Sequence, residues 1–446
     1  MPWLKRFLGL EGSSDLLDFD SPNNYGWGED SGQHFTAAVA PTEIPPTPAP
    51  DIYVWSDAYS VVGGNFSMDI GPDYFSEQVS LWGFDSKDSG ISMPGLTAWQ
   101  TDYHSYGWSL GFTEGQDWFA ESYSQYDSRS QESGVSTPDF SVIQGTSVWG
   151  ASSFSVFQMP GYSSTSQSES NGTSAWSDIQ VGNVGIYAGF GQFHQASSTT
   201  FTGEGWYSSS SQVEDTLWNN QGIETPSFGR ESSMYADHFT YDGLSISFGQ
   251  DGTLQFLSES HGESNLLEKS SSLRIGDSFQ WSDESLSRSH GDSFAVWQGG
   301  FMSEHDKSTT SSWENGVSTP NSGFEKGGSI TRSEVDTHTV FDNGPLVGVD
   351  TKTDTFQFDF HQSGWENTLG GQLYGYKDVG GFATETTQTD HFADGSTSLL
   401  VQYSAGFHSE SFGTPSLLSP DLGIPQNMAQ LVGAMAPHPA DHGLMM

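Results

Sequence analysis

Residues 241–261 read YDGLSISFGQDGTLQFLSESH, and this stretch decides the fold. Leucine, isoleucine and phenylalanine alternate with serine and other polar residues on both sides of Gly249-Gln250-Asp251-Gly252. Successive side chains of a strand point to opposite faces, so a two-residue period predicts strands with one apolar and one polar face. Glycine tolerates the positive φ that a tight turn requires. The stretch therefore predicts a β-hairpin.

The same pattern recurs along the chain. Alternating apolar residues precede turn-forming sequences at residues 114–117, at Gly191 and at Gly299-Gly300, and Phe356, Phe358 and Phe360 also alternate. Serine-rich runs at residues 122–133, 163–170 and 303–312 fit either the polar arms of long strands or irregular loops. We therefore predict an all-β fold, an elongated antiparallel meander of hairpins. It would form a sandwich, a roll or an irregular solenoid, with short helices only at the two termini.

Three predicted turns have similar sequences: SGVSTP at 133–138, QGIETP at 221–226 and NGVSTP at 315–320. Their glycines, Gly134, Gly222 and Gly316, lie 88 and 94 residues apart. This predicts a degenerate repeat in which each unit packs against the next. The uneven spacing argues against a solenoid with strict rungs.

The domain organisation follows from changes in composition. Residues 1–50 are predicted to form a short helix and a proline-rich flexible linker, because closely spaced prolines favour extended polyproline II. Residues 51–417 form the repetitive all-β region. Residues 418–446 are predicted to form a C-terminal helix and tail, because helix-forming residues are followed by Pro437.

The chain is strongly acidic, with 56 acidic against 13 basic residues and a net charge of −43. Such a charge opposes binding to polyphosphates and anionic lipids, so no nucleic-acid partner is expected. The carboxylates form either a solvated surface or a reservoir of oxygen ligands for Ca²⁺. No cofactor is required on this evidence, and Ca²⁺ stays an open partner.

Several classes of protein are excluded. The chain has no cysteine, which excludes disulfides and thiol catalysis. No run of apolar residues reaches the length of a membrane-spanning helix, so no transmembrane segment is expected. The apolar stretch after Lys5-Arg6 is too short for a cleavable secretory signal.

One sequence matches a catalytic motif. Gly107-Trp108-Ser109-Leu110-Gly111 fits Gly-x-Ser-x-Gly, in which a hydrolase serine occupies a turn between strand and helix. Here Tyr106, Trp108, Leu110 and Phe112 alternate straight through the motif, which predicts a mid-strand Ser109 on the opposite face. We interpret the motif as a chance match, assign no catalytic residue and expect no enzyme.

Other candidate ligands and acids are scattered. Histidine occurs at His34, His104, His194, His238, His261, His290, His305, His338, His361, His391, His408, His438 and His442. No His-Glu-x-x-His motif occurs, so metal ligands stay unknown. Asp350, Asp354 and Asp359, and Glu259 with Glu263, would suit glycoside chemistry only as pairs about 5–9 Å apart.

Aromatic residues are abundant, with 15 Trp, 16 Tyr and 30 Phe. Alternation predicts that most of them form the core, because each buries a large area. Any that are exposed on a sheet would form stacking platforms for sugar rings or patches for assembly.

The C-terminal sequence MAQLVGAMAP, residues 428–437, resembles the uncleaved ends of bacterial proteins exported by type I (ABC-exporter) secretion. The resemblance covers residues 418–446 and the acidic, cysteine-free composition. It implies export without an N-terminal signal peptide and an extracellular or cell-surface location. The chain lacks the Gly-Gly-x-Gly-x-Asp repeats common in that group, which leaves calcium unassigned.

These observations together favour a secreted or cell-surface acidic β-protein that acts as a structural, adhesive or matrix-binding component. Its expected partners are extracellular polysaccharide or cell-surface components, with self-association as a further option. Two alternatives come from other classes: a carbohydrate-active enzyme on a β-sandwich, and a cytoplasmic acidic protein of a halophile.

Overall fold

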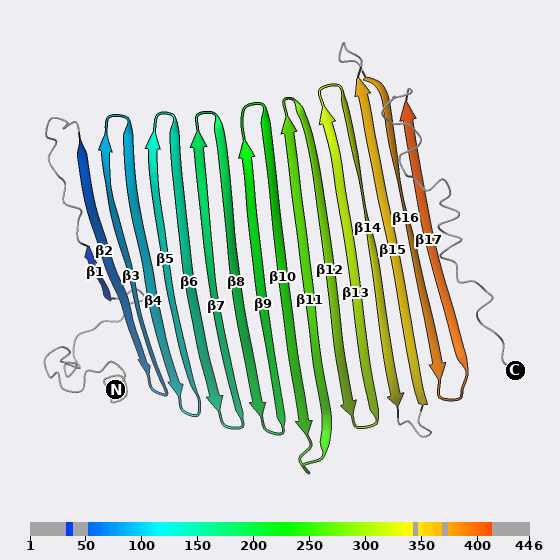
Figure 1. Ribbon diagram of the computed structural model, residues 1–446. Coiled ribbons are helices and arrows are strands. Elements are labelled where there is room, and N and C mark those ends of the chain that lie inside the picture. Colours follow the sequence, from blue (N-terminus) through cyan, green and yellow to red (C-terminus); the bar gives the residue numbers. More distant parts are fainter. Residues whose placement is uncertain (1–32, 39–51, 342–346, 368–372, 413–446) are drawn as a thin grey trace.

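The computed structural model describes residues 33–38, 52–341, 347–367 and 373–412. Every regular element in these residues is a strand, and consecutive strands from β2 to β17 pair antiparallel (Figure 1). The strands are β1 (Gln33–Ala38), β2 (Tyr53–Gly71), β3 (Tyr74–Met93), β4 (Leu96–Gly115), β5 (Phe119–Thr137), β6 (Phe140–Met159), β7 (Tyr162–Val181), β8 (Val184–Gly203), β9 (Trp206–Glu224), β10 (Phe228–Phe248), β11 (Leu254–Ile275), β12 (Ser278–Trp297), β13 (Gly300–Thr319), β14 (Ser322–Phe341), β15 (Val347–Asn367), β16 (Leu373–Phe392) and β17 (Thr397–Phe412). The prediction of an all-β antiparallel meander is confirmed.

The sheet is a single open layer rather than a sandwich or a roll. Figure 1 shows β2 along one edge and β17 along the other, with β1 beside part of β2. β1 pairs with residues 61–66 of β2, so a strand lies within the stretch expected to be a linker. The predicted terminal helices fall outside the described residues. Within the part of the chain that the structure describes, no helix is long and apolar enough to cross a membrane.

The hairpin turns occur largely where the sequence predicts them. β10 ends at Phe248 and β11 begins at Leu254. In that turn Gly252 has a φ of 79°, and Asp251 Oδ1 accepts hydrogen bonds from the backbone N–H (3.1 Å) and the hydroxyl (2.6 Å) of Thr253. The prediction of a turn at Gly191 is wrong, since β8 continues to Gly203.

The serine-rich runs are the middles of long strands. Residues 122–133, 163–170 and 303–312 lie inside β5, β7 and β13. Serine has no strong preference for strands, but here each run has a hydrogen-bonded strand on both sides. The neighbouring strands therefore extend the pairing through segments whose own sequence does not specify a strand.

The repeat is more regular than the sequence indicates. Residues 54, 98, 142, 186 and 230 lie in one row across the sheet, 44 positions apart. Gly134, Gly222 and Gly316 also share a row. The longer of the two glycine spacings, 94 residues between Gly222 and Gly316, arises at the β10–β11 hairpin. The five-residue turn of this hairpin is longer than two-residue turns such as Pro94-Gly95.

The two faces of the sheet differ in composition. Directly paired residues on neighbouring strands share a face, so the pairing assigns every strand residue to one of two faces. We call one the tryptophan face, because it carries Trp55, Trp82, Trp99, Trp149, Trp176, Trp206, Trp218, Trp281, Trp297 and Trp365. We call the other the histidine face, because it carries His104, His194, His238, His261, His290, His305, His338 and His391.

Tryptophans of the tryptophan face lie over glycines of the neighbouring strand. Trp99 pairs with Gly134, and Trp281 pairs with Gly316. A Cβ placed on either glycine would overlap the indole ring. The missing side chain therefore lets each ring lie flat on the sheet, which is why the repeated glycines stand inside strands and not in the turns.

The expected aromatic core is not formed. Among the described residues the buried apolar side chains are Val61, Leu110, Val379 and Ala383. Trp82 is 40% exposed and Phe190 is 60% exposed. A single layer leaves both faces in contact with solvent, so aromatic rings are covered only by their neighbours on the same face.

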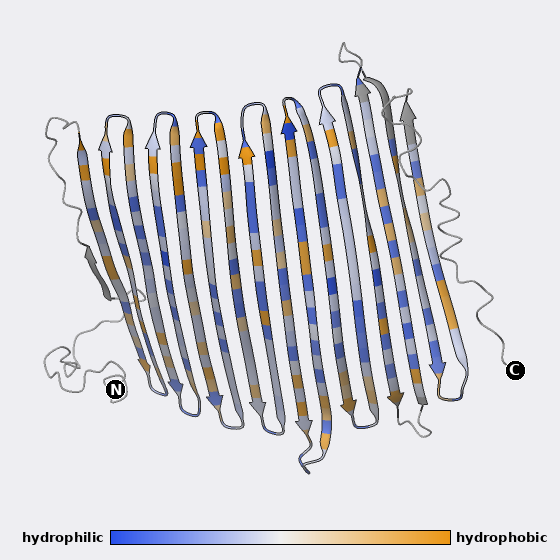
Figure 2. Ribbon diagram, viewed as in Figure 1, coloured by the Kyte–Doolittle hydropathy of each residue, from blue (hydrophilic) through white to orange (hydrophobic). Residues whose placement is uncertain are grey.

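Apolar residues gather toward the hairpin ends of the strands, and more hydrophilic residues occupy the middle (Figure 2). The clearest apolar row runs across β2 to β9 on the histidine face, near one set of turns. It consists of Val54, Ile91, Ala98, Val135, Val142, Ile179, Ile186 and Ile223. The polar chemistry of this face is therefore concentrated in the middle of the sheet.

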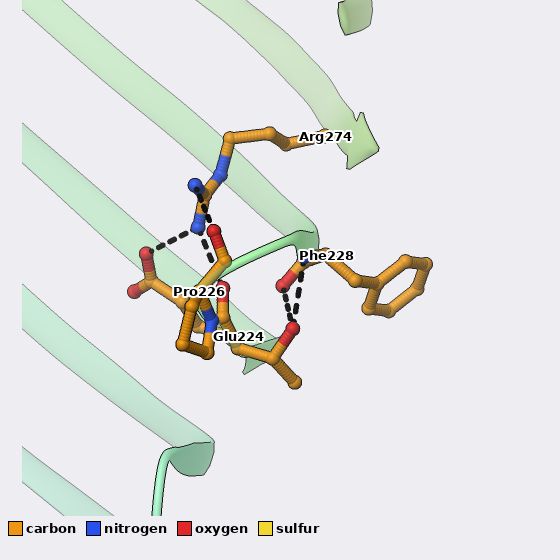
Figure 3. A network of polar contacts seen from close by, with 5 residues as sticks. Glu224, Pro226, Phe228 and Arg274 are labelled. Atoms are coloured by element: carbon orange, nitrogen blue, oxygen red, sulfur yellow. Dashed lines mark hydrogen bonds and ion pairs between the residues drawn. The ribbon is translucent and has the colours of Figure 1, made fainter. Parts of the chain in front are cut away.

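The β9–β10 turn is held by a residue of the next strand. Arg274 of β11 donates to Glu224 Oε1 (2.9 Å) and to the carbonyls of Thr225 (2.9 Å) and Pro226 (3.3 Å) (Figure 3). Within the turn, the Thr225 hydroxyl accepts from the N–H of Phe228 (2.8 Å). The guanidinium thus satisfies carbonyls that the turn cannot pair within itself.

Candidate functional site

Two polar rows cross the histidine face at right angles to the strands. The first runs from β7 to β12 and consists of Asn171, His194, Asp215, His238, Asn265 and Arg288. The second runs from β10 to β15 and consists of Asp242, His261, Asp292, His305, Asp336 and Lys352. We name them the Asn171 row and the Asp242 row. In both, hydrogen-bond donors and acceptors largely alternate along the row.

Neighbouring imidazoles and acceptors in these rows are hydrogen-bonded across the strands. His194 Nδ1 lies 2.7 Å from Asp215 Oδ1, and His238 Nδ1 lies 2.8 Å from Asn265 Oδ1. In the Asp242 row, His261 Nδ1 lies 2.6 Å from Asp242 Oδ1. These pairs are partly exposed, so water reaches them.

The densest group of ligand atoms lies where β12 and β13 meet. His305 Nδ1 is 2.6 Å from Asp292 Oδ1, and His290 Nε2 is 3.1 Å from Asp292 Oδ2. The two imidazole rings lie 4.8 Å apart, edge to face. One ligand atom from each of the three residues lies within 4.8 Å of the other two. We call His290, Asp292 and His305 the β12–β13 triad.

The charge state of the Asp242 row follows from these contacts. The hydrogen bond from His305, with the charges of His290 and His305, lowers the pKa of Asp292. The hydrogen bond to Asp292 raises the pKa of His305, and the hydrogen bond to Asp242 raises that of His261. The row therefore favours ionised carboxylates beside protonated imidazoles.

A shallow depression opens next to the triad on the same face. Its lining includes His261, Asp292, His305, His338 and Asp350. His338 and Asp350 are themselves hydrogen-bonded. The depression therefore presents several imidazole and carboxylate groups to solvent within one small area.

The structure separates the carboxylates that the sequence offered for glycoside chemistry. Asp350 and Asp354 stand four residues apart on β15, roughly 13 Å along a strand. Asp359 points to the tryptophan face. Glu259 and Glu263 are likewise four residues apart on β11. None of these pairs meets the separation that two-carboxylate hydrolysis requires.

Ser109 lies within β4, as the sequence predicts. Its hydroxyl is 2.7 Å from the hydroxyl of Ser124 on β5. The strand continues on both sides of Ser109, and the residue shares the tryptophan face with other serines. The nucleophile turn of Gly-x-Ser-x-Gly hydrolases is therefore absent at this position.

The triad was missed because spacing along one segment does not reveal it. In a hairpin, residues at equal distances from the turn become partners. In the structure the turn is Gln298-Gly299, because Trp297 pairs with Gly300, and Asp292 and His305 each lie six residues from it. The predicted turn at Gly299-Gly300 is one residue too late, so counting outward from it pairs Asp292 with Lys307. A turn placed at Gln298-Gly299 is the signal that would have brought Asp292 and His305 together.

Comparisons with known proteins give little guidance. No family model matches the chain, and no curated protein matches it. Among solved structures, the chain is similar to the ferric yersiniabactin uptake receptor FyuA from Yersinia pestis, with 7% identity over 81% of this chain and 79% of that chain and a TM-score of 0.25. It is also similar to the siderophore receptor PiuA from Acinetobacter baumannii, with 6% identity, 80% and 81% coverage and a TM-score of 0.23. The ferric-catecholate import receptor Fiu from E. coli K12 shows 8% identity, 86% and 82% coverage and a TM-score of 0.23.

These TM-scores are too low for the similarity to assign a fold or an activity to this chain. The structures found are receptors and transporters, not adhesive or structural components. The interpretation as a structural, adhesive or matrix-binding component has no counterpart among these structures, and we do not retain it. A carbohydrate-active β-sandwich is also excluded for the described residues, because they form one layer.

Proposed function

We propose that the protein binds divalent cations on its histidine face and is not an enzyme. The observation that carries this proposal is the alternation of imidazole and carboxylate groups across neighbouring strands, in the Asp242 row above all. Imidazole nitrogens and carboxylate oxygens are common protein ligands of divalent metal ions. Because these groups alternate along the row, an imidazole and a carboxylate lie side by side on adjacent strands.

The charge of the whole chain supports this proposal. With a net charge of −43, the protein concentrates cations near its surface before any ligand engages them. Diffuse attraction of this kind is screened by salt, whereas coordination by fixed side chains persists. Calcium belongs to the proposal as a ligand for the many carboxylates, which match its preference for oxygen.

Acidification should release the bound cations. Protons and metal ions compete for the same imidazole nitrogens, because a coordinating histidine must be neutral. The hydrogen bonds to Asp242 and Asp292 raise the pKa of His261 and of His305, which favours the proton in this competition.

We also propose a location outside the cytoplasm, at the cell surface or beyond it. The support is the acidic, cysteine-free composition and the resemblance of residues 428–437 to type I secretion signals. Detection of the native protein in culture medium and cell fractions tests this. Removal of residues 418–446 should leave the protein inside the cell.

Equilibrium dialysis of the full chain tests the function. The protein is dialysed against Ca²⁺, Mn²⁺ or Zn²⁺ in about 0.15 M NaCl, which screens diffuse attraction. We expect at least one of these ions to be retained at about pH 7.5 and released near pH 5. Retention of none of the three ions at about pH 7.5 would overturn the proposal, and so would retention that does not change with pH.

A further inference from the structure

We infer that the β12–β13 triad is a discrete site for a transition metal ion such as Zn²⁺, with His290, Asp292 and His305 as its protein ligands. This inference rests on the proposed function and deepens it, since it names the ion class and the ligands. Two imidazole nitrogens and one carboxylate oxygen form a donor set that Zn²⁺, Ni²⁺ and Cu²⁺ accept. Ca²⁺ needs six to eight oxygens, and the triad has one carboxylate.

The geometry is close to that of a bound ion. Ligand atoms about 2.0–2.2 Å from one zinc ion lie within about 4 Å of each other. The three atoms here lie within 4.8 Å, so a small rotation of the side chains closes the site. His290 and His305 are 36% and 45% exposed, which leaves their rings free to turn. The open side faces solvent, where water completes the coordination.

The surroundings of the triad carry charges of both signs. Glu263 on β11 and Lys307 on β13 stand opposite His290, and Asp336 on β14 stands opposite His305. His261 on β11 stands opposite Asp292, and Arg288 precedes His290 by two residues on β12. The acidic and basic side chains around the triad therefore nearly cancel. When both imidazoles are neutral, the charge that remains at the site is that of Asp292.

A similar grouping nearby shows why the triad differs from the rest of the face. Asp350 on β15 also stands between two histidines, His338 on β14 and His391 on β16. His391 Nδ1, however, lies 3.1 Å from the hydroxyl of Thr397. Only one imidazole therefore contacts Asp350. In the triad, both imidazoles contact the same carboxylate.

Binding replaces protons by the ion. The imidazoles of His290 and His305 each offer a nitrogen lone pair once their proton on that nitrogen has left for solvent. Asp292 offers a carboxylate whose Oδ1 lies 2.6 Å from His305 Nδ1 and whose Oδ2 lies 3.1 Å from His290 Nε2. Proton release accompanies the binding of Zn²⁺, so its heat depends on the ionisation enthalpy of the buffer.

Isothermal titration of Zn²⁺ into the full chain tests the inference, with the double variant His290→Ala/His305→Ala. The matched control is His361→Ala/His408→Ala, which removes two histidines of the tryptophan face and leaves the histidine face intact. We expect the triad variant to lose at least about tenfold in affinity for Zn²⁺, since loss of outer-shell partners alone costs 10–100-fold. The control should bind Zn²⁺ as the natural protein does. Circular dichroism of each variant checks that the strands are retained.

Two outcomes would overturn the site. One is an unchanged Zn²⁺ affinity in the triad variant, and the other is an equal loss in both variants, which would mean that histidines on both faces contribute alike and that no discrete site exists. Either result leaves the proposed function standing if divalent ions are still retained in dialysis. If the triad variant fails to fold, His305→Gln replaces it. Glutamine keeps a hydrogen bond to Asp292 but supplies no imidazole, so the same loss is expected.

Discussion

At the scale of single residues, the histidine face is organised by hydrogen bonds between a carboxylate and an imidazole. Asp292 contacts both His290 and His305, and Asp242 contacts His261. These contacts favour the charged forms of Asp292, His305 and His261. Because the groups are largely exposed, the pairs act more on the local protonation state than on the stability of the sheet.

Replacement of Asp292 by Asn tests this coupling. The raised pKa of His305 should fall toward its ordinary value of 6.5, because its largest cause is the hydrogen bond to Asp292. NMR titration of the His305 ring measures the change, and His194 in the same spectra serves as the control. A titration of His305 that does not move would mean that the contact with Asp292 does not form in solution.

The contact between Asp292 and His305 also makes the stability of the fold depend on pH. A histidine with a raised folded pKa stabilises the fold below its unfolded value of 6.5, and this contribution is lost as pH rises through the folded pKa. For Asp292, with a lowered pKa, the contribution is present above 3.8 and lost as pH falls. The natural protein should therefore exceed Asp292→Asn in urea midpoint near pH 5.5 and lose that advantage as pH rises through the folded pKa of His305. An advantage that grows with pH would contradict this assignment.

Arg274 is the residue on which the β9–β10 turn depends. It donates to Glu224 and to two turn carbonyls. Arg274→Ala should lower the free energy of unfolding by about 1 kcal/mol, since an exposed ion pair contributes little and the carbonyl hydrogen bonds contribute more. Arg274→Lys should restore only part, because lysine lacks the planar group that spans several acceptors. Urea denaturation of both variants measures the effect, and a full restoration by lysine would assign the role to charge alone.

At the scale of elements, the long hairpins are fixed by their turns and by rows that match across strands. The row containing Gly134, Gly222 and Gly316 is an example of such matching, because each glycine accommodates an aromatic ring from the preceding strand. An aromatic residue opposite a glycine covers backbone that would otherwise be open to water. The row also discourages a register shift, since any slip would set rings against serine or acidic side chains.

Gly134→Ala tests this packing. A Cβ at residue 134 would overlap the Trp99 ring, so the ring must leave the sheet. We expect a loss of about 1–3 kcal/mol in unfolding free energy, the range for inserting a methyl group into a packed site. Gly150→Ala in β6 is the control, because its Cβ would meet only Ser170 O at 3.8 Å and Asn171 Cβ at 3.9 Å, which are ordinary contacts. Urea midpoints and Trp fluorescence report both. Equal behaviour of the two variants would show that the ring does not rest on Gly134.

The sequence predicts the turns and the strand type well, because these depend on local chemistry. The hairpin at residues 241–261 forms as expected, and Pro138, Pro226 and Pro320 mark turns. Strand length is not predictable from the same signals. Residues 122–133 lack apolar alternation, and they are extended because β4 and β6 pair with them on both sides.

The candidate site is a product of pairing and not of a motif. His290 and His305 lie 15 positions apart with no spacing that indicates metal binding. They meet because the turn between β12 and β13 sets the register and the pleat puts both on one face. In the linear sequence the histidines are scattered, and only the strand pairing brings them together. The absence of a second layer is equally hidden, since alternation fits a sandwich as well as an open sheet.

At the scale of the whole molecule, a single layer with a net charge of −43 has little interior to offset repulsion. Few side chains are buried in the described residues, so stability comes from the strand pairing and from contacts within each face. Exposed like charges are screened by salt over a Debye length of about 10 Å at 0.1 M. The electrostatic part of the stability should therefore respond strongly to ions in solution.

This leads to a prediction that separates screening from binding. Raising NaCl from about 0.01 M to about 0.5 M should raise the thermal unfolding midpoint, because screening weakens the repulsion among the acidic residues. Zn²⁺ or Ca²⁺ at a concentration too low to change the ionic strength should raise it further, because ligand that binds the folded state stabilises it by mass action. Tetramethylammonium chloride in place of NaCl controls for ion-specific effects. A midpoint that is insensitive to NaCl would mean that the acidic side chains are too far apart to repel, and one that responds to NaCl but not to divalent ions would count against the cation-binding function.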